Sequence, residues 1–207
     1  MMPRTVRDGM PRTIDVSTLP TYAYGHRNLV WWGTGAMMII EGSMFALLIV
    51  SYIYLKGRNP HWPPGFFAPV LFWGTLNTAV MLLSVVPNYI YKHAAEELDL
   101  HKMRRWMLVA LVFGVAFNII RIFEYRALNV WWDSNAYGSI VWALLTFHTV
   151  HTLTDLGDSI VLTLLMFTGP VQESHFVDVS ENAYYWYFVV IAWIPLYVCI
   201  YLAPRFA

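Results

Sequence analysis

The sequence has few charged residues for its length. Only 13% of its 207 residues are Asp, Glu, Lys or Arg, whereas 58% are hydrophobic and 17% are aromatic. A typical soluble domain carries about 25% charged residues. The net charge is zero and no basic run is interleaved with aromatic residues, so nucleic acid is not an expected partner. These proportions exclude an ordinary soluble domain and indicate one integral membrane domain of the all-α class.

Cysteine is almost absent as well, since Cys199 is the only one. One cysteine cannot form an internal disulfide, a C-x-x-C-H haem attachment or a cysteine-ligated cluster. No apolar stretch precedes Leu29, so a cleavable signal peptide is not expected. Residues 1–28 are therefore interpreted as a polar amino-terminal tail.

Five apolar runs are long enough to cross a membrane as helices. A helix rises by roughly 1.5 Å per residue, and the hydrocarbon core of a bilayer is about 30 Å thick. The charged residues gather between these runs, as in multi-pass membrane proteins. Residues 29–207 are thus predicted to form a bundle of five transmembrane helices, at 29–55, 67–91, 103–125, 137–168 and 183–203.

The basic residues predict the orientation of the bundle. With five spans, the side that carries the tail and the second and fourth loops has eight Lys or Arg residues, and the other side has four. Because basic residues concentrate in cytoplasmic loops, the amino terminus is predicted to be cytoplasmic and the carboxyl terminus outside. The eight are Arg4, Arg7, Arg12, Arg27, Lys92, Lys102, Arg104 and Arg105, and the four are Lys56, Arg58, Arg126 and Arg205.

Four ionisable side chains share one stripe of the fourth predicted helix. His148, His151, Asp155 and Asp158 stand at i, i+3, i+7 and i+10. The favoured interpretation is a hydrogen-bonded polar seam that faces other helices or a partner subunit. A metal site and a path for protons or water remain as alternatives. The stripe spans about 15 Å of helix, so one metal ion could be bound by only two neighbouring side chains of the stripe. For this reason no metal site is predicted.

Three other charged residues within the apolar runs are candidate site residues. Glu41 stands near the middle of the first run, followed by Gly42 and Ser43, and is interpreted either as a polar contact between helices or as a proton-handling residue. Arg121 and Glu124 are three residues apart near the end of the third run. They are expected to form an ion pair close to the membrane interface, with contact to a lipid headgroup as the alternative.

With these residues in view, the chain resembles subunit III of the haem-copper terminal oxidases in its five-helix bacterial form, from about Leu29 to the end. It departs from the family at Tyr187 and Val190, where a histidine and an aspartate are usual, and at Asp155 and Asp158, where the family is apolar or small. The motifs that carry the resemblance are Glu41 with Met44-Phe45, Asn77 to Ser84, Arg104-Arg105-Trp106, Phe123-Glu124-Tyr125, Tyr137-Gly138-Ser139, Phe147-His148 with His151, Tyr185-Trp186, and Trp193 to Tyr201.

The resemblance implies a non-redox accessory subunit of a respiratory oxidase in the bacterial cell membrane. Such a subunit packs against catalytic subunit I and other oxidase subunits, stabilises the catalytic subunit and supports proton uptake. The resemblance places haem and copper on partner subunits and no catalytic centre on this chain, with bound phospholipid as an additional ligand. The electron donor, cytochrome c or a quinol, would bind elsewhere. Alternatives are the corresponding subunit of a nitric oxide reductase, an intramembrane metal-binding protein that uses the helix-four stripe, and a proton or ion conductor built around Glu41 and the helix-four stripe.

Overall fold

The chain folds into five long helices. The computed structural model describes residues 29–65, 68–169 and 173–206. In order, the helices are α1 (Leu29–Gly57), α2 (Leu71–Glu96), α3 (Leu100–Arg126), α4 (Ala136–Thr168) and α5 (Glu173–Tyr197). All five are long and apolar enough to cross a membrane, and the described residues contain no strand. The predicted all-α membrane bundle is confirmed.

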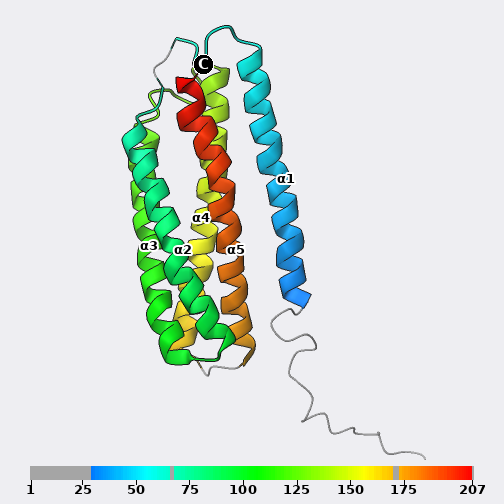
Figure 1. Cartoon of the computed structure of the whole chain (residues 1–207), viewed down its shortest axis with the longest axis vertical. Coiled ribbons are helices and arrows are strands. Elements are labelled where there is room, and N and C mark those ends of the chain that lie inside the picture. Colours follow the sequence, from blue (N-terminus) through cyan, green and yellow to red (C-terminus); the bar gives the residue numbers. More distant parts are fainter. Residues whose placement is uncertain (1–28, 66–67, 170–172, 207) are drawn as a thin grey trace, which may run out of the picture.

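Helices α2 to α5 form a four-helix bundle, and α1 packs against its outside. In the bundle, α2 contacts α3 and α5, and α4 contacts α3 and α5, whereas α1 contacts mainly α4 and α5. Figure 1 shows α1 standing apart at one side, with the start of α1, the α2–α3 turn and the start of α5 at the same end. We call this end the amino-terminal end. The carboxyl terminus lies at the opposite end, as an odd number of spans requires.

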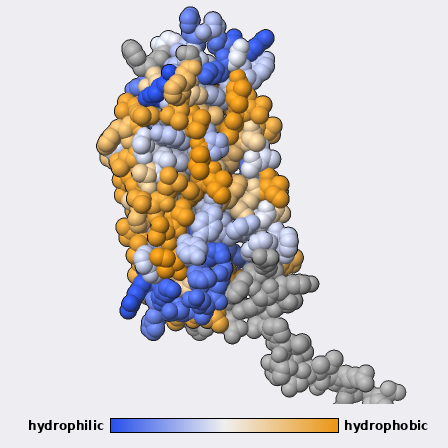
Figure 2. Space-filling view, viewed as in Figure 1, coloured by the Kyte–Doolittle hydropathy of each residue, from blue (hydrophilic) through white to orange (hydrophobic). Residues whose placement is uncertain are grey.

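The surface of the bundle is apolar around its middle. Figure 2 shows a broad hydrophobic belt between two hydrophilic ends. Large side chains such as Ile39, Val112 and Ile191 are 75%, 68% and 64% exposed. Because lipid chains are as apolar as these side chains, such exposure suits a bilayer and not water.

Capping residues define the starts of two helices, and α5 ends in two tighter or wider helical turns. The side chains of Asp99 and Asn135 accept hydrogen bonds from the amides of Lys102 and Gly138, which satisfies free N–H groups at the starts of α3 and α4. At the other end of the chain, α5 continues through a π-helical turn, Val198–Leu202, and a 3-10 turn, Ala203–Arg205.

Helix α5 differs most from the prediction. It begins at Glu173, ten residues before the predicted start at 183. The hydropathy pattern marks only the apolar part of a helix, and the segment before Ala183 carries Asp178 and Glu181. The predicted second span starts at residue 67, which lies outside the described residues, as does the tail at 1–28.

Candidate functional site

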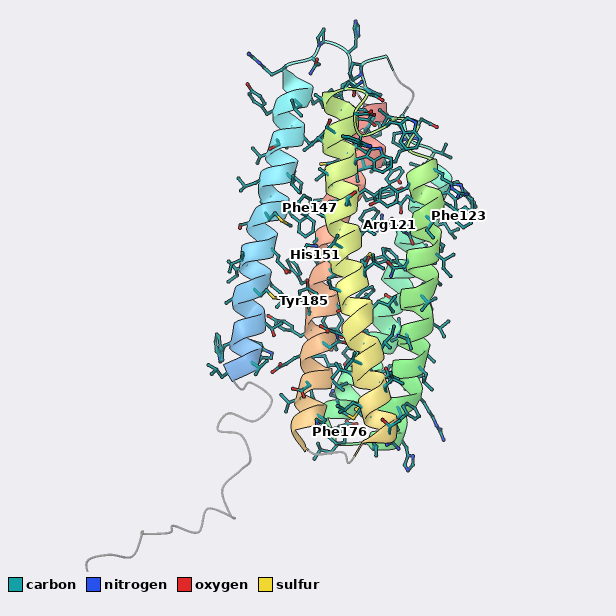
Figure 3. The ribbon with its side chains drawn as sticks, turned by 180° about the vertical axis from the view of Figure 1, so that it is seen from behind. Arg121, Phe123, Phe147, His151, Phe176 and Tyr185 are labelled. Carbon is teal, nitrogen blue, oxygen red and sulfur yellow. The ribbon has the colours of Figure 1, made fainter. Side chains whose placement is uncertain are left out.

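A buried ion pair lies between α3 and its neighbours. Arg121 and Glu124 are 1% and 0% exposed, and Nη1 of Arg121 lies 2.7 Å from Oε2 of Glu124. The spacing of three residues on one helix brings the two groups together. Both side chains are buried inside the bundle, where they pair with each other. Figure 3 shows Arg121 between α3 and α4.

Two other segments complete the hydrogen bonding of Glu124. From α2, Nδ2 of Asn77 donates to Oε2 at 2.8 Å, and from the π-helical turn the hydroxyl of Tyr201 donates to Oε1 at 2.7 Å. Tyr201 reaches this position by packing on Gly74, where an added Cβ would lie 2.4 Å from Cζ of the tyrosine ring. The carboxylate therefore ties α2, α3 and the end of the chain together.

Helix α4 joins the same cluster through His148. Its Nδ1 lies 3.1 Å from Nη2 of Arg121, and its Nε2 lies 3.1 Å from the carbonyl oxygen of Val189 on α5. Since the guanidinium only donates and the carbonyl only accepts, the imidazole must be neutral with its proton on Nε2. The guanidinium carbon also lies 4.2 Å from the ring centroid of Trp193. We refer to Asn77, Arg121, Glu124, His148 and Tyr201 as the buried network.

His151 turns toward α1 instead. Its Nδ1 donates to the carbonyl oxygen of Phe147 at 2.6 Å, and its Nε2 faces Oε2 of Glu41 at 3.6 Å. The hydroxyl of Tyr185 on α5 donates to the same Oε2 at 2.9 Å. Figure 3 shows His151 and Tyr185 on the side of α4 and α5 that faces α1. Glu41 therefore links α1 to both of the helices on which it packs.

Asp155 lies beside a small cavity inside the four-helix bundle. It is 5% exposed and accepts a hydrogen bond from Nδ2 of Asn182 at 3.4 Å. The cavity measures about 30 Å³, and Ser84, Asn88 and Ser159 contribute polar groups to its wall. A cavity of this size that is lined in part by polar groups has room for one or two water molecules.

A larger cavity opens between α1, α4 and α5 at the amino-terminal half of α1. Its volume is about 530 Å³. We call it the acidic cleft, because five carboxyl-bearing residues line it and none of its described lining residues is Lys, Arg or His. The five are Glu41, Asp155, Asp158, Asp178 and Glu181.

The helix-four stripe thus divides among three environments. His148 belongs to the buried network, His151 faces α1, and Asp155 borders both cavities. Asp158 is exposed on this chain and borders the acidic cleft. Among the described residues, no group of three His, Cys, Asp or Glu side chains is arranged to hold a metal ion.

Several residues of these sites were not identified as site residues from the sequence. Asn77 and Tyr201 appeared only as parts of family motifs, although an uncharged amide within an apolar run marks a contact between membrane helices. Asp178 and Glu181 lie one turn apart and so share a face, but the segment was placed outside the fifth span. Tyr185 appeared in one family motif, and no other feature of the sequence indicated that it belongs to a site.

Comparison with known proteins identifies relatives along nearly the whole chain. A family profile described as "Cytochrome c oxidase subunit III" matches residues 59–204. "Probable cytochrome c oxidase subunit 3" of Mycobacterium bovis is 31% identical over 193 residues, which cover 89% of this chain and 93% of that protein. "Cytochrome c oxidase subunit 3" of Thermostichus vulcanus is 26% identical over 188 residues, covering 89% and 92%. The protein of the same name from Loxodonta africana is 27% identical over 176 residues, covering 81% and 65%.

Proposed function

Since the chain belongs to the cytochrome c oxidase subunit III family, we propose that it is a non-redox accessory subunit of a haem-copper respiratory oxidase. In this role it packs against catalytic subunit I and other oxidase subunits, stabilises the catalytic subunit and supports proton uptake during oxygen reduction. Haem and copper belong to the partner subunits.

The buried network is the observation that carries this proposal. Both ring nitrogens of His148 are engaged with protein groups, and Glu124 receives hydrogen bonds from three side chains. A histidine in this state has no free nitrogen for a haem iron or a copper ion. The deepest polar groups therefore serve to hold helices together, which fits a structural subunit.

A role in proton uptake is supported by the groups at the amino-terminal end. The acidic cleft extends along α1 to Glu41, which contacts the imidazole of His151 and the hydroxyl of Tyr185. Carboxyl groups at a membrane surface attract protons, and an intramembrane carboxyl beside an imidazole can exchange them. The proposed orientation places this end at the cytoplasmic face of a bacterial cell membrane.

The proposal is tested by purifying the tagged chain from its host membrane in a mild detergent. We expect a haem-bearing protein to co-purify, with a reduced-minus-oxidised haem spectrum and oxygen consumption that follow the tag through size-exclusion chromatography. Recovery of a stable, colourless protein without a haem-bearing partner would contradict the proposal. Reduction of nitric oxide in place of oxygen by the same complex would contradict the assignment to an oxidase.

A further inference from the structure

The acidic cleft carries negative charge that its described walls do not balance. Five of its lining residues bear carboxyl groups, on α1, α4 and α5, and none of the described lining residues is Lys, Arg or His. Like charges that share a partly dehydrated site repel one another, and a cation that enters the site relieves this repulsion. The cleft is therefore suited to a cationic group. A compact metal ion is not favoured, because no three of the described His, Cys, Asp or Glu side chains come together as ligands.

Glu181 indicates which kind of cation the cleft suits. Its side chain lines the cleft and the residue is 5% exposed, yet Oε1 accepts no hydrogen bond from any described group. Leaving a buried carboxylate oxygen without a donor is costly, and most such atoms in folded proteins are satisfied by protein, water or a ligand. The cation should therefore carry N–H donors, as a guanidinium or an ammonium group does.

The start of α1 lies at the level of Glu181. The ring of Trp31 stacks on that of Tyr184 in α5, with the ring centroids 5.2 Å apart and the ring planes at 12°. Leu29, the first residue of α1, precedes Trp31 by two residues, or about 3 Å of helical rise. Glu181 precedes Tyr184 by three residues, or about 4.5 Å of helical rise. Figure 1 agrees with this alignment, since α1 begins further from the amino-terminal end of the bundle than α5 does.

A basic residue precedes α1 directly in the sequence. Residues 1–28 contain four arginines, two aspartates and no lysine or glutamate, and Arg27 is the arginine nearest to α1. Two residues of polypeptide span at most about 7 Å, so the Cα of Arg27 lies within that distance of the Cα of Leu29. A guanidinium group presents five N–H donors in a planar fork, which matches the two oxygens of a carboxylate. Arg27 thus combines the charge, the donors and the position that the cleft requires.

We propose that the acidic cleft binds the guanidinium group of Arg27, so that the amino-terminal tail docks on the cleft of its own chain. The guanidinium donates a hydrogen bond to Oε1 of Glu181, and its charge offsets that of Asp178, one turn earlier on the same helix. Because Arg27 is tethered to α1, the contact forms within one molecule and needs no free ligand. It ties the start of α1, which packs on the outside of the four-helix bundle, to α5. This inference concerns how α1 is held and goes beyond the proposed function.

The test measures the chemical reactivity of Arg27 in the purified complex that contains this chain. Phenylglyoxal reacts with free guanidinium groups, and the modified arginines are quantified by mass spectrometry of the digested chain. Each rate is divided by that of Arg105, which is exposed at the start of α3. Arg27 is expected to react about tenfold more slowly in the wild-type complex than in Glu181→Gln, the factor that one charge-assisted hydrogen bond supplies.

Two further variants assign the protection of Arg27 to the cleft. Asp178→Asn should also accelerate the labelling of Arg27, and it supplies the result if Glu181→Gln does not assemble. Asp133→Asn is the matched control, because it removes an exposed carboxyl group outside the cleft and should leave the labelling rate of Arg27 unchanged. The yield of purified complex reports the assembly of each variant.

Three outcomes would overturn the proposal. The first is an equal labelling rate of Arg27 in the wild type and in the cleft variants that assemble. The second is an equal acceleration in Asp133→Asn, which would indicate a general loosening of the subunit. The third is an acceleration at Arg4, Arg7 or Arg12 without one at Arg27, which would assign the cleft to another part of the tail. The labelling is measured on this chain alone, so no outcome depends on the oxygen consumption that tests the proposed function.

Discussion

Removing one member of the buried ion pair should destabilise the subunit strongly. Glu124→Gln keeps the size of the side chain but removes the charge that compensates the guanidinium of Arg121, which is 1% exposed. An unpaired charge in such a position costs about 3 to 5 kcal/mol of folding free energy. Hydrogen bonds between membrane helices average only about 0.6 kcal/mol, so most of this cost comes from the stranded charge.

The expected magnitude can be checked by a double-mutant cycle. Arg121→Gln should cost a similar amount, because it leaves the carboxylate of Glu124 buried with only two neutral donors, Asn77 and Tyr201. The double variant removes both charges, so its cost should fall below the sum of the single costs by at least about 1.5 kcal/mol.

The assay is unfolding of the purified complex by sodium dodecyl sulfate, monitored by dissociation of this chain from the other subunits and by circular dichroism. Arg126→Gln serves as the matched control, since Arg126 ends the same helix and is exposed. Additive costs in the double variant, or single costs no larger than that of the control, would refute the argument that the two charges depend on each other.

Three further perturbations test other parts of the structure. Gly74→Ala should lower the free energy of unfolding by about 1 to 3 kcal/mol, because the new methyl group overlaps the ring of Tyr201. Gly33→Ala is the control, since the space around Gly33 is open, and it should leave the free energy of unfolding unchanged in the same thermal unfolding measurement. His151→Ala should leave the metal content of the complex unchanged in elemental analysis, and a stoichiometric loss of metal would revive the metal-binding alternative. Glu41→Gln should lower the rate of proton uptake in reconstituted vesicles, because an amide cannot exchange the proton that a carboxyl can, and an unchanged rate would remove Glu41 from the path.

The amino-acid sequence was sufficient for the parts of the fold that depend on local pattern. The low charge content and the five apolar runs predicted an all-α membrane bundle, and the interval of three residues between Arg121 and Glu124 allowed their ion pair. These features follow from the helical rise and repeat, which relate residues of one segment to each other and to the thickness of a bilayer.

The partners of these residues depended on the tertiary structure. The carboxylate of Glu124 accepts hydrogen bonds from Asn77 and Tyr201, which lie 47 and 77 residues away in the chain. The helix-four stripe predicted one polar seam, yet His148 faces α3 and α5 whereas His151 faces α1. The helical period determines which side chains share a face of one helix. The packing of the other helices determines which residues each part of that face contacts. For the same reason, only the placement of α1 beside α4 and α5 brought carboxyl groups from three helices into one cleft.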